Sequence, residues 1–158
     1  MLYTRVAPKK VKALRKRFEK NIRKRFIRYV FRHAIFDRTF EKYKHEFTIE
    51  RLIEGVLPDN YTVHHILPLA GGGTNDFSNM CIINKESHEF LHEYIIQPQT
   101  CLAESGQTWR MILPAAVEKF IYEKRAFWDI SPEELSKNMV VCRKRKKFEK
   151  ILHKKTCW

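Results

Sequence analysis

Four of the seven histidines of this chain lie within one segment of 29 residues, from His64 to His92. His88 and His92 stand four positions apart, a spacing that places both rings on one face of a helix. His64 and His65 are adjacent in a segment of strand-like composition, and a strand would direct them to opposite faces. Two imidazoles on one helical face can hold a metal ion together with a third one. This segment is therefore expected to fold with a strand beside a helix.

Two short strands joined by a loop are predicted before the histidine helix. Residues 61–66 and 80–84 are rich in β-branched and aromatic or other apolar side chains. Pro68 and the glycine run 71–73 lie between them and break regular structure. We therefore expect a β-loop-β unit.

The helix that carries His88 and His92 is expected to begin at Asn84 or Ser87, because both side chains can cap a helix N-terminus. Its predicted end is near Ile96, because Pro98 should stop it.

A long basic helix is predicted over residues 8–35. Apolar residues recur there in steps of three and four, and Lys and Arg fill the other faces. The apolar positions are Val11, Leu14, Phe18, Ile22, Phe26 and Val30. A second helix is predicted over 37–54, with Gly55 as its stop signal.

Two further helices are predicted in the C-terminal third. One is expected from near Pro114 to Phe127. The other begins at Ser131, which with Pro132 and Glu134 forms a capping box, and it leads into the basic tail.

The predicted fold class is α+β, mainly helical, around a small ββα unit. With 158 residues, of which 44% are hydrophobic, the chain fits one packed domain with arms. We divide it into a basic N-terminal helical arm (1–56), a histidine-bearing core (57–98) and C-terminal helices with a basic tail (99–158).

The net charge of +13 is divided unevenly along the chain. Residues 1–36 contain 13 Lys and Arg against one acid, and residues 137–158 contain nine against one. Residues 37–136 contain nine against 16 acids. Basic arms of this density attract polyphosphate, so the helix 8–35 and the tail 137–158 are expected to bind nucleic acid. The alternative is that these cations only form solvated helix faces and bind no nucleic acid.

The cysteine pattern excludes two common uses of this residue. No two of Cys81, Cys101, Cys142 and Cys157 have the C-x-x-C spacing of a structural zinc site. No apolar leader suggests export, so a disulfide framework is not expected. No uncharged stretch is long enough to span a membrane. A cytoplasmic protein is the expectation.

The histidine segment resembles the HNH, or ββα-metal (His-Me finger), endonuclease family. The residues that carry the likeness are His64 and His65, Pro68, Gly71 and Gly72, Asn79, and the H-x-x-x-H pair His88 and His92. The double histidine and the final interval of four are most similar to the colicin-type DNases. The likeness covers residues 61–96, about a quarter of the chain.

This resemblance implies a role for each of five residues. His64, His88 and His92 would bind one divalent metal ion. His65 would be the general base that deprotonates water for attack on a phosphodiester. Asn79 would tie down the loop and orient His65 through a backbone hydrogen bond; Asn75 is the rival for that role.

The implied metal is Zn, Ni, Mn or Mg, since three imidazoles suit the softer ions and the family is often active with Mg. Relatives often carry Asp at the position of His64 or a structural zinc between cysteine pairs, and this chain has neither. Lys85 and Arg143 are candidates for stabilising the transition state. The resemblance implies DNA as the favoured substrate. The settings that it implies are phage defence, phage genome packaging, homing of mobile elements and bacterial competition. A toxic nuclease would also need a protein partner that restrains or targets it.

Two other functions fit parts of the same pattern. His88, Glu89 and His92 also read H-E-x-x-H, the signature of zinc metalloproteases, with Glu89 as base and Glu118 as a possible third ligand. A non-catalytic, zinc-pinned module that binds nucleic acid is the second alternative. The protease leaves the upstream histidine pair and the glycine loop unexplained. The binding module has no use for a catalytic base beside a metal ligand. We therefore favour the nuclease.

Overall fold

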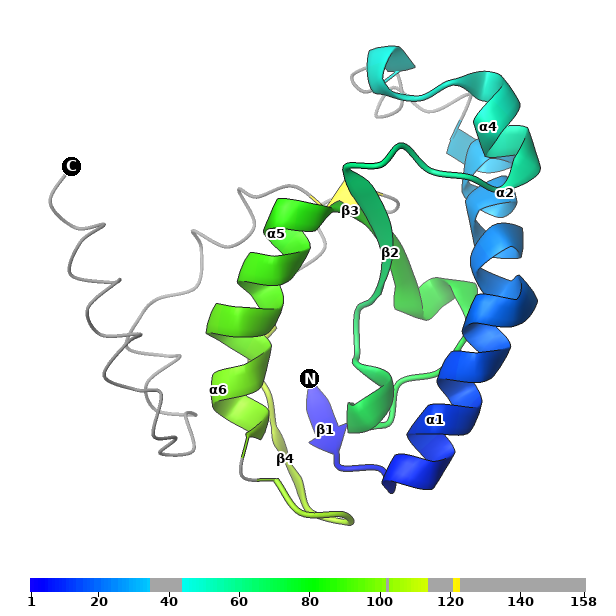
Figure 1. Cartoon of the computed structure of the whole chain (residues 1–158). Coiled ribbons are helices and arrows are strands. Elements are labelled where there is room, and N and C mark those ends of the chain that lie inside the picture. The colour runs from blue at the N-terminus through cyan, green and yellow to red at the C-terminus, as the bar shows by residue number, and fades with distance from the viewer. Residues whose placement is uncertain (35–43, 102, 114–120, 123–158) are drawn as a thin grey trace, which may run out of the picture.

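The computed structural model describes residues 1–34, 44–101, 103–113 and 121–122. It has the predicted α+β class: helices flank a small central sheet, and a second two-stranded sheet lies near the N-terminus (Figure 1).

The long basic helix is confirmed. It consists of α1 (Pro8–Arg17), a π-helical turn η1 (Phe18–Ile22) and α2 (Arg23–Ala34). The predicted apolar positions along it are buried or half-buried, whereas most of its Lys and Arg are exposed. The helix therefore packs along one stripe and leaves a basic surface on its other faces.

The second predicted helix, over 37–54, is shorter than expected within the described residues. A 3₁₀ turn, η2, covers Lys44–Glu46, and α4 begins only at Ile49 and ends at Glu54. Between them Phe47 leaves the helical path to enter the core, where 6% of its surface is exposed. Gly55 ends α4 in the left-handed conformation at φ 77°, as the sequence predicted. Residues 35–43 lie outside the described part.

The central sheet has the strand order β2-β3-β5. β2 (Tyr61–His65) and β3 (Met80–Asn84) pair antiparallel, with His64 opposite Cys81 and His65 opposite Met80. Both strands were predicted. Among the strands of the described residues, β2 lies at the edge of this sheet.

The predicted helix from Pro114 to Phe127 is wrong at Ile121–Tyr122, which form β5 and pair in parallel with β3. A β-branched and an aromatic side chain favour that pairing over a helix. The rest of that predicted helix, the helix from Ser131 and the tail 137–158 lie outside the described residues.

The histidine helix begins at Lys85, because the Asn84 side chain accepts a hydrogen bond from the Glu86 N–H at 2.9 Å. It runs as α5 (Lys85–Phe90), a π-helical segment η5 (Leu91–Ile96) and α6 (Gln97–Thr100). The predicted stop at Pro98 is wrong. The wide π turn before Pro98 relaxes the i to i−4 pairing with which a proline ring would clash.

A strand pair that the sequence analysis did not predict joins the first residues of the chain to residues 108–110. β1 (Leu2–Thr4) pairs antiparallel with β4 (Thr108–Arg110), and the Met1 ammonium donates to the Met111 carbonyl at 2.7 Å. The Tyr3 and Trp109 rings lie 4.5 Å apart. This pairing links the predicted arm 1–56 with the predicted segment 99–158.

The core is divided by the central sheet into two clusters. Alternate strand residues such as Val63 and Ile82 face the N-terminal helix, with Phe26 and Leu52 among their neighbours. The intervening residues, such as Ile83, face α5 and η5.

Within the described residues, no helix combines the length and the apolar character that crossing a membrane requires.

Candidate metal centre

The edge position of β2 explains how two adjacent histidines reach one site. His64 turns to the side of α5, where 4% of its surface is exposed, and His65 turns to the side of the N-terminal helix. No strand hydrogen-bonds to the outer edge of β2 within the described part, so a cavity along that edge can receive side chains from both faces.

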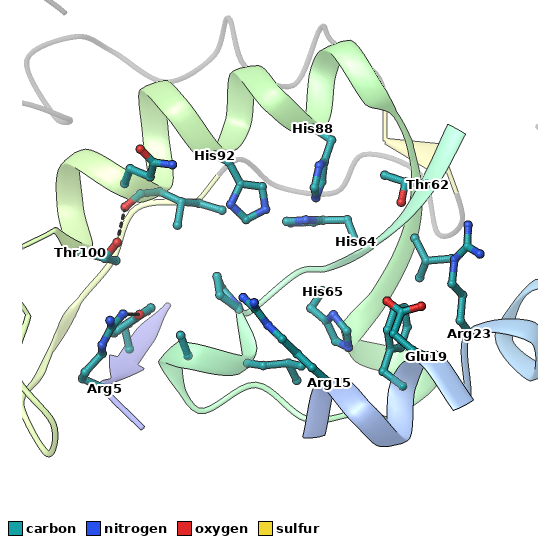
Figure 2. Close-up of a pocket in the computed structure, with 18 residues that line it drawn as sticks. Arg5, Arg15, Glu19, Arg23, Thr62, His64, His65, His88, His92 and Thr100 are labelled. Carbon is teal, nitrogen blue, oxygen red and sulfur yellow. Dashed lines mark hydrogen bonds between the residues drawn. The ribbon is translucent and has the colours of Figure 1, made fainter. Parts of the chain in front are cut away.

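The rings of His64, His88 and His92 converge. Their centroids lie 5.1 Å (64 to 88), 5.4 Å (64 to 92) and 4.4 Å (88 to 92) apart, and the rings stand edge to face. One ring nitrogen of each lies within 4.8 Å of the others. Figure 2 shows His88 and His92 reaching down from their helix toward His64 on β2.

These three imidazoles are held in the neutral form. Burial is the main cause in each case, and it lowers the pKa of His64 well below its usual value, that of His92 to about 4, and that of His88. Repulsion among the rings lowers the pKa of His64 and His92 further. A neutral imidazole has a free lone pair, which is the form that binds metals.

The arrangement fits a divalent cation. With metal–nitrogen bonds of about 2.1 Å, tetrahedral ligands stand roughly 3.4 Å apart, and small rotations of the rings would bring the three nitrogens to that spacing. Three neutral protein ligands would leave a position open for water or substrate.

His65 lies beside this cluster and is held from two sides. Its Nε2 is 2.9 Å from Oδ1 of Asn75, and its ring packs edge to face on Phe18 of η1 at 4.7 Å. Burial is the main cause that lowers its pKa; the Asn75 hydrogen bond acts in the opposite direction. Asn75, the rival to Asn79, is therefore the residue whose side chain contacts His65.

Asn79 fastens the loop between the strands. Its Oδ1 accepts from the Leu67 N–H at 2.9 Å, and its Nδ2 donates to the carbonyls of Leu67 (3.1 Å) and Thr74 (2.9 Å). Its own carbonyl accepts from the Ile66 N–H at 2.9 Å, next to His65. Asn79 therefore ties down the loop and reaches His65 only through the backbone.

A cavity of about 710 Å³ contains all four histidines. Its walls come from β1, the N-terminal helix, β2 with the following loop, and the histidine helix. Charged side chains that line it are Arg5, Arg15, Glu19 and Arg23.

Three arginines of this cavity were not predicted as site residues. In Figure 2, Arg15 extends from the N-terminal helix toward the space between His92 and His65. Its charge lowers the pKa of both rings. Arg5 is anchored by a hydrogen bond from Nη1 to the Tyr3 hydroxyl at 3.1 Å. A weak signal existed, because Arg15 lies between Leu14 and Phe18 of the apolar stripe.

The arginine or lysine candidates from the sequence lie elsewhere. Lys85 is exposed at the start of α5 and does not line the cavity. Arg143 and Glu118 are outside the described residues. Glu89 is exposed on α5 and does not line the cavity either.

The chain is similar to a protein with no function in its name. A protein of Escherichia coli (strain K12), named "Uncharacterized protein YhhZ", is 33% identical over 104 residues, or 66% of this chain. The chain spans about a quarter of that relative's length. No family model and no solved structure matches the chain.

Proposed function

We propose that this chain is a metal-dependent endonuclease of the HNH type, which hydrolyses phosphodiester bonds in nucleic acid. The observation that carries the proposal is the meeting of three neutral imidazoles with a fourth imidazole and with arginines in one cavity. A purely structural metal site would need neither a fourth histidine outside the set of metal ligands nor the arginines of this cavity, where three arginines stand against one carboxylate, Glu19.

His65 would act as the general base. It lies beside the metal cluster, its pKa is lowered, and it is half-exposed to the cavity, so it can take a proton from water near neutral pH. Asn79 would hold the loop that follows it.

Arg15 would bind the phosphate that is attacked. It enters the cavity from the wall opposite His92. A guanidinium matches the geometry of a phosphate and stabilises charge that develops on its oxygens. A Zn, Ni, Mn or Mg ion held by His64, His88 and His92 would polarise the phosphate and stabilise the leaving oxygen.

The substrate would be a polyanion held mainly through its backbone. The exposed Lys and Arg of α1 and α2 continue from the rim of the cavity, and such contacts carry little sequence information. We propose DNA as the main substrate, with a 5′ phosphate on the product, as the family resemblance implies. A cytoplasmic role in defence against phage, with a protein partner that restrains or targets the enzyme, belongs to the same proposal.

The exposed position of Glu89 disfavours a zinc metalloprotease, in which that carboxylate would have to face the metal-bound water. A binding module that does not cut nucleic acid remains the competing function for the same cluster. Only an assay of cleavage separates it from the nuclease.

The test is a cleavage assay on plasmid DNA, RNA and casein, with Mg, Mn, Ni or Zn and with EDTA. We expect metal-dependent nicking of DNA and no loss of casein. His65→Ala should lower the rate by about 10² to 10⁴, as expected for loss of a general base. Glu89→Ala is the control, an exposed residue of the histidine helix that does not line the cavity, and it should change the rate less than about 3-fold.

Two results would contradict this proposal. Salt-sensitive binding of nucleic acid without cleavage under any of the four metals would favour the binding module. Casein hydrolysis that depends on Glu89 and not on His65 would favour the protease.

A further inference from the structure

Asn75 connects the N-terminal helix to His65. Its Nδ2 donates to the Leu14 carbonyl of α1 at 3.0 Å, and its Oδ1 lies 2.9 Å from Nε2 of His65. Asn75 is half-buried in the loop between β2 and β3. It is thus a bridge between a residue of the basic helix and a ring of the cavity.

These two hydrogen bonds determine which ring nitrogen of His65 carries the proton. A backbone carbonyl can only accept, so the amide of Asn75 must turn its NH₂ toward Leu14 and its oxygen toward His65. The amide oxygen also only accepts, so Nε2 of His65 must be the donor. Nδ1 is then the nitrogen with the free lone pair.

The same helix holds the His65 ring at a second point. Phe18 stands four residues after Leu14, on the same side of the helix, and packs edge to face on the ring at 4.7 Å. Phe18 is buried, with 7% of its surface exposed, and belongs to the core. Arg15, which lines the cavity, lies between these two contact points in the sequence.

We propose that Asn75 is a positioning residue, which uses the Leu14 carbonyl of the basic helix to hold His65 as the Nε2–H tautomer with Nδ1 free to act as base. The assignment of His65 as base rests on the proposed function, whereas the tautomer does not. The helix that binds the phosphate backbone would thus also support the base, so that the ring is oriented only while α1 is docked.

The tautomer is measured first, because it does not depend on activity. Long-range ¹⁵N–¹H correlation NMR on the full chain near pH 7.5 reports which nitrogen of His65 is protonated. We expect protonated Nε2, with a ring N–H slow enough in exchange to be observed. Asn75→Ala should lose that N–H signal to solvent exchange.

Asn60→Ala is the matched control. It also removes one side-chain amide hydrogen bond, to Glu46 at 3.4 Å, but away from the cavity. It should leave the His65 signals unchanged. Protonated Nδ1 in the unmodified protein, or a persistent Nε2–H signal in Asn75→Ala, would overturn the proposal.

Kinetics on an oligonucleotide then tests the consequence. Partners that orient metal-binding imidazoles are worth about 10- to 100-fold. We expect a similar factor for the oriented base, so Asn75→Ala should lower kcat by about that factor and change KM less than about 3-fold. Asn75→Asp keeps an acceptor for Nε2, loses the donor to Leu14 and adds a negative charge that raises the pKa of His65, so its kcat is taken on the high-pH plateau. It should recover part of kcat.

The outcomes separate this proposal from the nuclease itself. No cleavage by the unmodified protein would end the proposed function, while the NMR measurement would still decide the role of Asn75. Two kinetic results would overturn the positioning role and leave the nuclease standing, provided that thermal melting shows both variants to be folded. One is a kcat of Asn75→Ala equal to that of the unmodified protein. The other is a kcat of Asn75→Asp no higher than that of Asn75→Ala.

Discussion

The three clustered imidazoles share a requirement: each must stay uncharged although its neighbours are close. His64 is almost fully buried, and His88 and His92 are half-buried against it. A proton on one ring would be both poorly solvated and repelled by any charge on the other two. Without a metal ion, the folded protein therefore resists protonation at these residues.

We predict that the metal-free protein loses stability as the pH falls from about 7 to 4.5. Imidazoles of the unfolded chain bind protons near pH 6.5, whereas the pKa of His92 in the folded state is about 4. Between these values the unfolded state binds more protons, so the free energy of unfolding decreases with falling pH. The half-exposed His92 should contribute on the order of 1–2 kcal/mol, less than the full shift implies because solvent screens it.

Urea denaturation of EDTA-treated protein at several pH values measures this loss. His92→Gln should flatten the curve between pH 6.5 and 4.5. His45→Gln, a change at an exposed ring outside the cavity, should leave the curve unchanged. An unchanged slope in His92→Gln would show that the folded ring titrates like a free one.

The loop between β2 and β3 is the element on which the site geometry depends. It contains the 3₁₀ turns η3 (Leu69–Gly71) and η4 (Phe77–Asn79). Gly73 lies against the Leu67 carbonyl, and a Cβ there would overlap that carbonyl and come within 2.9 Å of Nδ2 of Asn79. Glycine at this position lets Asn79 close the loop, and the closed loop carries Asn75.

We predict that Gly73→Ala costs more than about 2 kcal/mol, because the clash is with backbone that cannot yield without opening the loop. Gly106→Ala is the control: Gly106 has φ 90° and no atom within 4 Å of an added Cβ. That change should cost about 1–2 kcal/mol from backbone strain alone. Thermal and urea denaturation measure the loss in free energy of unfolding for each variant. Equal losses for Gly73→Ala and Gly106→Ala would contradict the role of Gly73 in closing the loop.

At the scale of elements, periodic patterns predicted well and pairings between distant segments did not. The apolar stripe from Val11 to Val30 predicted the long helix, because each position of a helix is fixed by its own turn. β1 and β4 are too short to show alternation, and each is stabilised by a partner about a hundred residues away. The prediction that the histidine helix stops at Pro98 was wrong, because the π turn that accommodates this proline has no sequence signal.

The site residues also fall into a group that the sequence predicted and a group that it did not. The convergence of His64 with His88 and His92 follows from one strand and one helix in a local unit, so spacing alone could suggest it. Arg5 and Arg15 reach the cavity only because β1 and α1 pack across it. That docking depends on contacts through Tyr3 and Phe18, which no spacing along the chain encodes.

At the scale of the whole molecule, the helix α1 has two basic faces with different positions relative to the cavity. Arg15 and Glu19 line the cavity. Lys12 lies three positions before Arg15 and seven before Glu19, and Lys16 lies three positions before Glu19. Such spacings place Lys12 and Lys16 on the side of the helix that faces the cavity. Lys10 and Arg17, seven positions apart, lie on another side, and all four of these cations are exposed.

A nucleic acid seated over the cavity would contact the face of Lys12 and Lys16. We predict that Lys12→Glu with Lys16→Glu weakens binding of a DNA duplex and lowers the slope of log Kd against log salt by about 2, since each lost phosphate contact accounts for about 0.9. Lys10→Glu with Arg17→Glu changes the net charge equally on the same helix. It should lower affinity through long-range attraction but leave the slope within about 0.5.

Fluorescence anisotropy between 50 and 300 mM salt, with EDTA to prevent cleavage, measures both pairs. The comparison isolates position from charge, because both double variants carry the same net charge and alter the same helix. If the two pairs behave alike, the basic surface acts only as a diffuse attractor and the cavity does not set the path of the nucleic acid. If only the Lys12 and Lys16 pair changes the slope, the backbone runs along α1 past Arg15, which brings a phosphate to the histidines.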